Sequence, residues 1–309
     1  LRYPVQVAFG APLPAGTPAV AVRQAVGVEG MEAYFHRPYA YRLLQHGFVR
    51  MARRRLRFMA TADGLSGELS YFKALVGAIV FARKLKKILG PGEMVGLLVP
   101  STVGGALANI AVQLLGKVPV NLNYTASSET IASCARRCGV THTLTSRKFL
   151  ERLPLDVPGV PVYLEDIRES VTGRDRVIGM LLALLAPVHL LDHILGAARR
   201  TDEDLATVIF SSGSEGEPKG VMLTQRNVMT LVESAQEVFP HNWNSCVVGF
   251  LPLFHSFGYA VCLWTPFLAG IRSVFHPNPL EPKAIGGLIE KHGGSIMVCT
   301  ATFLQGFIR

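Results

Sequence analysis

The segment from Thr207 to Val221 has the sequence TVIFSSGSEGEPKGV, and the rest of the chain can be interpreted outward from it. Its first four residues form an apolar, β-branched run that is typical of a buried strand. Small and turn-forming residues follow, then Lys219 and Gly220. Residues 223–238 have the pattern of a helix, with Thr224 placed to cap it. The segment therefore predicts a strand, a flexible loop with a lysine at its end, and a helix.

A loop of this composition is suited to binding phosphate. Glycines let the backbone approach an anion closely and direct successive N–H groups at it. Hydroxyl groups add donors or a ligand for Mg²⁺, and a lysine adds a mobile positive charge. Other known loops have a similar composition, so the order of the residues must decide which kind of loop this is.

Two such loops are excluded by spacing. The Walker A loop needs a glycine, four residues, and then Gly-Lys followed by Ser or Thr. Here a proline precedes Lys219 and a glycine follows it. The nucleophile elbow needs G-x-S-x-G, and neither Ser212 nor Ser214 has glycines on both sides at that spacing.

The remaining order, S-S-G-S-x-G-x-P-K-G, resembles the phosphate loop of the adenylate-forming (acyl-activating, AMP-binding) superfamily, which usually has T-S-G-T-T-G-x-P-K-G. A second segment, GFLPLFHSFG at residues 249–258, supports this resemblance. The family carries an LPLFH-type segment about thirty residues after the loop, and residues 251–255 match it. The resemblance implies that His255 lies beside the acyl pocket and the adenylate.

A narrower resemblance concerns Glu215, which stands where the family commonly has a threonine. The resulting S-G-S-E-G is similar to the membrane-linked fusions of a 2-acylglycerophosphoethanolamine acyltransferase with an acyl-[acyl-carrier-protein] synthetase. Further segments resemble the same fusions, and the resemblance extends, with gaps, from about residue 71 to the end of the chain. These segments are VNLNYT at 120–125, LTSRKFL at 144–150, VYLEDI at 162–167 and LFHSFG at 253–258.

The resemblance implies an α/β fold: the large N-terminal domain of adenylate-forming enzymes, truncated, with stacked and mostly parallel sheets flanked by helices. Alternating strands and helices over residues 93–144 independently predict α/β with a parallel sheet. By resemblance, residues 1–29 are the C-terminal tail of a glycerolipid acyltransferase domain, 30–69 a basic linker, and 70–309 a partial AMP-binding domain. Since no Met begins the chain, we expect a piece of a longer protein.

The implied activity is ATP-dependent activation of a fatty acid to acyl-AMP, followed by transfer to the thiol of acyl carrier protein or of CoA. In the parent protein it would be coupled to reacylation of a lysophospholipid. ATP and Mg²⁺ are the implied cofactors, with Ser214 assisting the metal and His255 and Lys219 as catalytic residues. The phosphate-binding residues implied are Ser211, Ser212, Gly213, Ser214, Glu215, Gly216, Lys219 and Gly220.

Three alternatives stay open. A free-standing long-chain fatty acid–CoA ligase shares every motif above and differs in its thiol. A phosphate-loop hydrolase would turn over ATP without a fatty acid, and a non-catalytic membrane-associated adaptor would do no ATP chemistry. Thr300 and Thr302 lie where the family lines its acyl pocket, and they are weaker candidates.

Charge and cysteine content bear on location. The 309 residues carry a formal net charge of +9, and residues 36–90 hold twelve basic and two acidic side chains, a net of +10. Such a cluster fits anionic lipid headgroups or an acidic carrier protein, and no nucleic-acid recognition module is present. Five cysteines without a C-x-x-C motif favour a reducing cytoplasm. We expect association with the cytoplasmic face of a bacterial inner membrane.

The longest apolar stretch is VIGMLLALLAPVHLLDHIL at residues 177–195. Pro187 and His189 interrupt it, so it falls short of the roughly twenty apolar residues of a membrane-spanning helix. Arg174, Arg176, Arg199 and Arg200 flank it. Two interpretations remain: a buried or subunit-packing helix, and an interfacial helix in a membrane surface.

Overall fold

The computed structural model describes residues 9–35, 43–211 and 218–308, and it divides the chain into two compact units. The first unit covers residues 1–41 and contains the 17-residue helix α1 (Ala19–Phe35). The second covers residues 42–309 and holds every other element. Each unit is a separate body, and the functional motifs all belong to the second.

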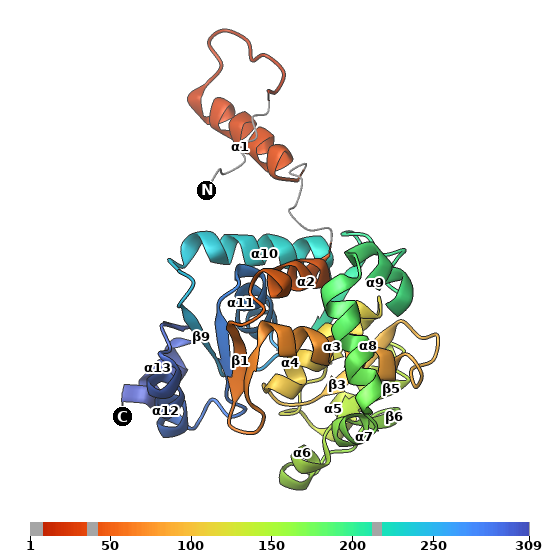
Figure 1. The fold of residues 1–309 in the computed structure, drawn as a ribbon. Coiled ribbons are helices and arrows are strands. Elements are labelled where there is room, and N and C mark those ends of the chain that lie inside the picture. The colour runs from red at the N-terminus through yellow and green to blue at the C-terminus, as the bar shows by residue number, and fades with distance from the viewer. Residues whose placement is uncertain (1–8, 36–42, 212–217, 309) are drawn as a thin grey trace. The chain divides into compact units, whose positions relative to one another are not determined.

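The second unit alternates helices and strands, shown in order in Figure 1. Its helices are α2 (Leu44–Arg54), α3 (Tyr71–Leu85), α4 (Val103–Leu114), α5 (Ser128–Arg137), α6 (Arg147–Arg152), α7 (Leu164–Glu169), α8 (Gly173–Leu185), α9 (Val188–Leu195), α10 (Gln225–Val238), the π-helix η1 (Gly258–Trp264), α11 (Thr265–Ala269), α12 (Pro282–His292) and α13 (Ala301–Ile308). Its strands are β1 (Met59–Asp63), β2 (Gly67–Ser70), β3 (Met94–Leu98), β4 (Val118–Asn121), β5 (His142–Thr145), β6 (Val160–Tyr163), β7 (Leu205–Phe210), β8 (Gly220–Thr224), β9 (Cys246–Gly249), β10 (Arg272–Phe275) and β11 (Ile296–Met297).

The strands form two sheets and a hairpin. One sheet has the order β11-β9-β10-β1-β2, in which only β2 is antiparallel to its neighbour. The other has the order β4-β3-β5-β6 and is entirely parallel. Strands β7 and β8 pair antiparallel, and the Thr207 hydroxyl of β7 donates a hydrogen bond to the Pro119 carbonyl of β4 at 2.7 Å. The predicted α/β class with mostly parallel sheets is confirmed.

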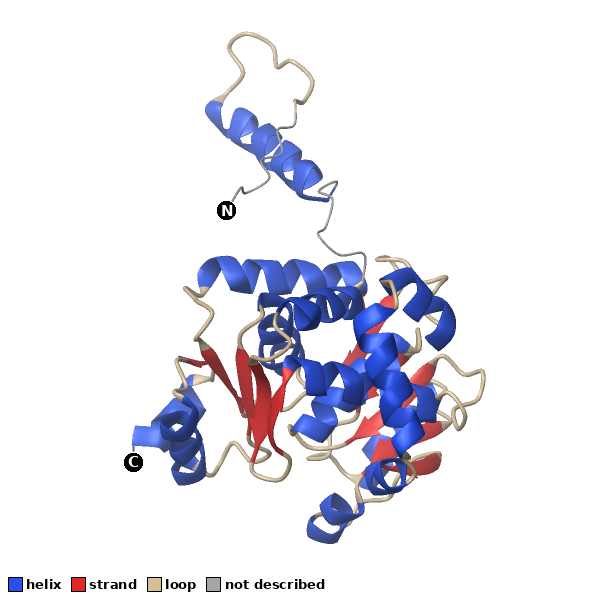
Figure 2. Cartoon of the chain, viewed as in Figure 1, coloured by secondary structure: helices blue, strands red, loops and turns tan. Residues whose placement is uncertain are grey.

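Helices α3 and α4 pass between the two groups of strands (Figure 2). Their small side chains permit this close packing, because Ala78, Ala106 and Ala111 are completely buried. A pair of amides is buried among them: Asn109 of α4 and Asn121 of β4 exchange hydrogen bonds of 3.1 and 2.8 Å. Mutual pairing satisfies both polar groups inside an apolar layer.

The structure corrects one local prediction. The sequence predicts a helix beginning at residue 223 directly after the phosphate loop, whereas residues 220–224 form strand β8 and the helix begins at Gln225. The loop therefore connects two paired strands. The predicted cap is confirmed, since the Thr224 hydroxyl accepts from the Asn227 N–H at 3.2 Å and the Asn227 side chain accepts from the Thr224 N–H at 3.0 Å.

Part of the predicted linker, residues 30–69, is folded. From residue 42 on it belongs to the second unit, where it supplies α2, β1 and most of β2. One face of α2 is buried through Leu44, Phe48 and Ala52, while its arginines 50 and 54 stay exposed. The assignment of residues 1–29 to an acyltransferase tail remains a prediction.

Candidate functional site

The phosphate loop lies at the end of the β7–β8 hairpin. At its base the Ser211 N–H donates to the Lys219 carbonyl at 3.0 Å. Gly220 lies so close to β7 that a Cβ there would approach the Phe210 ring to 3.1 Å, which explains the glycine after the lysine. The ladder between β7 and β8 brings the two ends of the loop together.

A further cation holds the second end of the loop. Arg137, the last residue of α5, donates from its guanidinium to the carbonyl of Pro218 at 2.5 Å. The Lys219 side chain beside it is exposed and makes no ion pair within the described residues. The Lys219 ammonium and the Arg137 guanidinium together give the base of the loop the charge that a polyphosphate requires.

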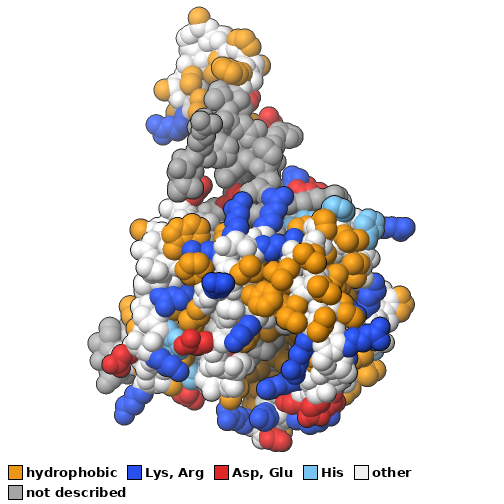
Figure 3. Space-filling view, in the orientation of Figure 1, with side chains coloured by type: hydrophobic (Ala, Val, Ile, Leu, Met, Phe, Trp, Pro, Cys, Tyr) orange, Lys and Arg blue, Asp and Glu red, His pale blue; other side chains and the backbone are white. Residues whose placement is uncertain are grey.

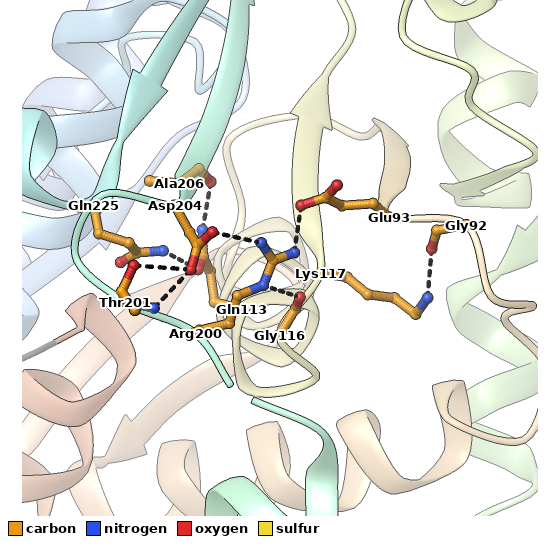
Figure 4. Close-up of polar contacts among 10 residues, drawn as sticks. All are labelled: Gly92, Glu93, Gln113, Gly116, Lys117, Arg200, Thr201, Asp204, Ala206 and Gln225. Atoms are coloured by element: carbon orange, nitrogen blue, oxygen red, sulfur yellow. Dashed lines mark hydrogen bonds and ion pairs between the residues drawn. The ribbon is translucent and has the colours of Figure 1, made fainter. Parts of the chain in front are cut away.

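Two polar clusters anchor the start of β7, as Figure 4 shows. In the first, the Gln113 amide donates to the Ala206 carbonyl, and Gln225 donates to Gln113 at 2.7 Å. Both glutamines are buried. These bonds tie β7 to α4 and α10, so the hairpin that carries the loop stands on a fixed base.

The second cluster centres on Arg200, just before β7. Its guanidinium donates to the Gly116 carbonyl at 2.7 Å and to the Glu93 carboxylate at 2.5 Å, and it lies 3.5 Å from the Asp204 carboxylate. Arg200 thereby joins the turns that precede β3 and β4 to the residue before β7 (Figure 4). Arg200 therefore links the amino ends of β3, β4 and β7.

A cavity of about 1520 Å³ collects the opposite, carboxyl ends of the strands. Residues that follow β1, β3, β4, β5, β6, β9 and β10 all line it. In open α/β sheets, ligands bind in the crevice outside the carboxyl ends of the strands. The lining positions at the ends of the seven strands are 63–66, 99, 100, 102, 124–126, 146, 148, 149, 164, 165, 252 and 276–281.

The Asp63 carboxylate holds two walls of this cavity together. It accepts hydrogen bonds from the Leu65 N–H at 2.9 Å within its own turn and from the Val103 N–H at 2.7 Å. Val103 is the first residue of α4, where a helix presents unpaired N–H groups and favours negative charge. The turn after β1 in one sheet is therefore fixed to the helix that follows β3 in the other.

The LPLFH segment, residues 251–255, enters the site after β9. Pro252 lines the cavity, and the Phe254 ring meets the Tyr124 ring, which also lines it. The turn after this segment requires a glycine at position 258, because a Cβ there would overlap the carbonyl oxygen of Pro252. The segment thus contributes to the cavity wall through Pro252.

His255 follows on this segment and is exposed, with its ring 4.6 Å from the Phe254 ring. Desolvation by the surrounding apolar side chains lowers the pKa of its imidazole below the ordinary value of 6.5. Within the described part of the chain, no side-chain hydrogen bond joins His255 to Ser211 or Lys219. The lowered pKa keeps the imidazole neutral near pH 7.

Several of the predicted residues lie outside the described part of the chain. These are Ser212, Gly213, Ser214, Glu215 and Gly216. The side chain of Thr302 is likewise not described, and Thr300 is exposed immediately before α13. Their predicted roles remain predictions.

Two residues of the site escaped the sequence reasoning. Arg137 lies on α5, and nothing in its local sequence indicates that it reaches the loop. Tyr124 belongs to the VNLNYT segment, but only the structure shows that its hydroxyl is shielded from solvent and has no hydrogen-bond partner among the described residues. Burial raises the pKa of Tyr124 to about 12. The only signal in the sequence for Tyr124 is an aromatic residue shortly after the end of a strand.

The hairpin that carries the S-S-G-S-x-G-x-P-K-G motif and the large cavity at the carboxyl ends of parallel strands are the two features of this α/β fold that bear on its function. The chain belongs to the family of AMP-binding enzymes, because the family model described as "AMP-binding enzyme" matches residues 49–309. Enzymes of this family use ATP with Mg²⁺.

Known proteins support this membership. The chain is 30% identical over 185 residues to 4-coumarate–CoA ligase-like 3 of Oryza sativa subsp. japonica, covering 56% of this chain and 30% of that protein. It is 27% identical over 260 residues to fatty acyl-CoA synthetase A of Dictyostelium discoideum, covering 79% and 37%. The chain spans about a third of the length of these relatives.

A solved structure shares the fold. The O-succinylbenzoate coenzyme A synthetase (MenE) of Bacillus subtilis, in complex with AMP, superposes with a TM-score of 0.67 at 17% identity. The match covers 85% of this chain and 63% of that one. The expected fold, the N-terminal domain of adenylate-forming enzymes, is thereby confirmed.

Proposed function

We propose that this protein activates a fatty acid with ATP to give acyl-AMP and pyrophosphate, and that a thiol then displaces AMP. The observation that carries the proposal is the apolar cavity at seven strand ends. The hairpin that bears the phosphate-loop motif is bonded to β4 through Thr207 and Pro119, and Tyr124, which follows β4, lines the cavity. In this reaction a carboxylate attacks the α-phosphate of ATP. Positioning and charge neutralisation dominate such chemistry.

The cavity has the lining that a fatty acid requires. Its interior is formed by apolar side chains from α3, α4 and the segment around α6: Phe72, Val76, Val80, Phe81, Leu107, Phe149, Leu153 and Leu155. Cations also line it, including Lys73, Lys148 and Arg168. An apolar chamber of this size accommodates a long alkyl chain, and the cations favour its carboxylate end.

The hairpin supplies the contacts for ATP. Ser211, Lys219 and Gly220 lie at the base of the loop, where backbone N–H groups and an ammonium serve phosphate oxygens. The loop residues between them, including Ser214 and Glu215, would complete this cradle, with Ser214 as the hydroxyl toward Mg²⁺. When bound, Mg²⁺ neutralises the charge of the triphosphate.

His255 is proposed to orient the acid, because it lies on the same segment as Pro252, which lines the cavity. Its lowered pKa keeps the imidazole neutral near pH 7, so it donates a hydrogen bond without adding a competing charge. The aromatic contact between Phe254 and Tyr124 holds the segment that carries it. In this role His255 binds the fatty acid, whereas Lys219 binds the phosphates of ATP.

The thiol is proposed to be the phosphopantetheine of acyl carrier protein. The basic excess of residues 36–90 supports an acidic protein as the acyl acceptor. CoA is the second candidate, favoured by the matching fatty acyl-CoA synthetase A. Coupling to reacylation of a lysophospholipid rests on the resemblance to the acyltransferase fusions and belongs to the full natural protein.

The test is fatty-acid-dependent exchange between ATP and pyrophosphate, measured on the full natural protein. Exchange should require the fatty acid and should fall by at least about tenfold in Lys219→Ala, since a charge-assisted bond to phosphate contributes about 1.5–3 kcal/mol. Lys87→Ala, which removes an exposed lysine in the turn after α3, is the matched control and should retain the activity. A folded protein without exchange would refute the proposal.

The thiol acceptor is tested in the second half-reaction. Formation of acyl-thioester is compared between acyl carrier protein and CoA at equal concentration. A preference for CoA would identify a fatty acid–CoA ligase and exclude acyl carrier protein as the acceptor. Turnover of ATP without any fatty acid would instead identify a hydrolase.

A further inference from the structure

Helix α8 turns its small side chains toward the protein. Gly179 packs against α3 so closely that a Cβ there would lie 2.5 Å from Cγ2 of Val80. Ala183, one turn further, is completely buried, and Arg53 of α2 donates to its carbonyl at 2.7 Å and to that of Ala186 at 2.5 Å. The side of α8 that meets the protein is therefore already filled.

The large side chains point the other way. On α8 they recur at intervals of three and four residues, which places them along one side of a helix. A second, shorter set follows on α9. The set, here named the α8–α9 face, is Val177, Met180, Leu181, Leu184, Leu185, Leu190 and Ile194, each 36–73% exposed. Figure 3 shows a continuous apolar patch where Figure 1 places these helices.

The carboxylates of α8 and α9 are paired with basic side chains, whereas exposed cations border the face. Both carboxylates of the two helices are engaged: Asp175 lies 2.7 Å from the Lys84 ammonium, and Asp192 lies 2.9 Å from the His46 ring. Arg174 precedes Val177 by three positions, so it extends the stripe at its amino end and is exposed. Figure 3 shows Lys and Arg side chains around the patch.

We propose that the α8–α9 face lies flat on the surface of an anionic lipid bilayer. An aliphatic stripe bordered by cations is the chemistry of helices that rest in the membrane interface. The seven residues are all aliphatic or methionine, whereas the cores of protein interfaces are enriched in Tyr, Trp and Arg. No helix in the described ranges is long and apolar enough to span a bilayer.

Two residues connect this surface to the cavity. Arg176 and Met180 of α8 line the cavity, and Met180 is also a member of the α8–α9 face. If the proposed function holds, docking sets the chamber for the acyl chain beside the lipid phase in which fatty acids dissolve. The docking itself does not depend on that function.

The proposal is tested by sedimenting the full natural protein with vesicles of phosphatidylcholine, with or without phosphatidylglycerol. The protein should bind the anionic vesicles and release as salt rises. Leu181→Glu/Leu185→Glu should weaken binding by roughly a hundredfold, because two inserted side chains are lost. Val160→Glu/Val238→Glu, with the same charge change at exposed sites elsewhere, should weaken it far less.

The lipid charge is tested separately. Arg174→Gln should weaken binding roughly fivefold at low salt. Leu181 and Leu185 are 53% and 73% exposed, so their substitution should leave the melting temperature unchanged and the variants folded.

Three results would overturn the inference. The first is vesicle binding that Leu181→Glu/Leu185→Glu leaves unchanged. The second is a wild-type protein that binds no vesicles. The third is a dimer that the same variant dissociates, which would assign the face to a second copy of the chain. Exchange of ATP and pyrophosphate with a soluble short fatty acid, measured without vesicles, tests the proposed reaction independently.

Discussion

The rings of Tyr124 and Phe254 meet edge to face, with their centroids 4.8 Å apart. Tyr124 follows β4, and Phe254 belongs to the LPLFH segment after β9, so this contact joins two motifs that are far apart in the sequence. The Tyr124 hydroxyl beside it has no partner among the described residues. A ligand in the cavity would reach this shielded hydroxyl after a local rearrangement of the cavity wall.

Tyr124→Phe should leave the free energy of unfolding unchanged or raise it by up to about 1 kcal/mol, because a shielded hydroxyl without a partner is costly. The ring contact survives in this variant. Thermal stabilisation by added fatty acid should become smaller than in the wild type. A lower free energy of unfolding in the apo protein would contradict this, since it would mean that the hydroxyl is already bonded.

Arg137→Gln should weaken ATP binding by up to about fivefold, because its guanidinium no longer holds the Pro218 carbonyl at the end of the loop. The free energy of unfolding should change by less than about 0.5 kcal/mol, as for most exposed positions. Titration with ATP, followed by calorimetry, measures the effect. Arg136→Gln, the exposed neighbour on the same helix, is the control, and equal weakening in both variants would exclude a specific role for Arg137.

Gly179→Ala should destabilise the protein by about 1–3 kcal/mol, because the new Cβ would force α8 away from Val80 of α3. Gly77→Ala is the matched control on α3. There a Cβ would meet only Leu107, at 3.6 Å, and replacing a mid-helix glycine should stabilise by up to about 1 kcal/mol. Denaturation with urea measures both, and the idea fails if the two variants change stability equally.

His255 should make stability sensitive to acid. Its pKa in the folded protein lies below the ordinary 6.5, so below that pH the unfolded chain binds the proton more readily and folding becomes less favourable. Above about pH 7.5 both states carry a neutral ring and the effect disappears. The loss of stability between about pH 7 and pH 5 should be smaller in His255→Asn than in the wild type. Equal losses in the two proteins would show that desolvation of this ring is not the cause.

The strand β7 and the cap at Thr224 could be predicted because each depends on neighbouring residues alone. Strand β8 could not be predicted, because the largely apolar sequence GVMLT at residues 220–224 also fits the first turn of a helix. Only its partner β7, paired across the phosphate loop, decides between the two. The residue order of the loop indicated phosphate binding without revealing the hairpin.

The stretch at 177–195 shows a different limit. Its periodicity reveals two sides of a helix, one with Gly179 and Ala183 and one with leucines, but not which side meets the protein. Hydrophobicity favours burial of the leucines, yet α3 comes so close that only small residues fit. The arginines of residues 42–57 misled in the opposite way, since their charge indicated a linker while Leu44 and Phe48 between them fill the core.

The family resemblance implied an acyl pocket, but the lining of the cavity could not be predicted, because it is assembled from seven turns that lie far apart in the chain. In this construction, the residues that determine substrate specificity are different from the residues that determine the fold. An insertion or a substitution after any one strand reshapes the chamber and leaves the hydrogen-bond ladders of both sheets intact. Descendants of such a scaffold can exchange one acid for another in small evolutionary steps, each tested by selection without risking the folded state.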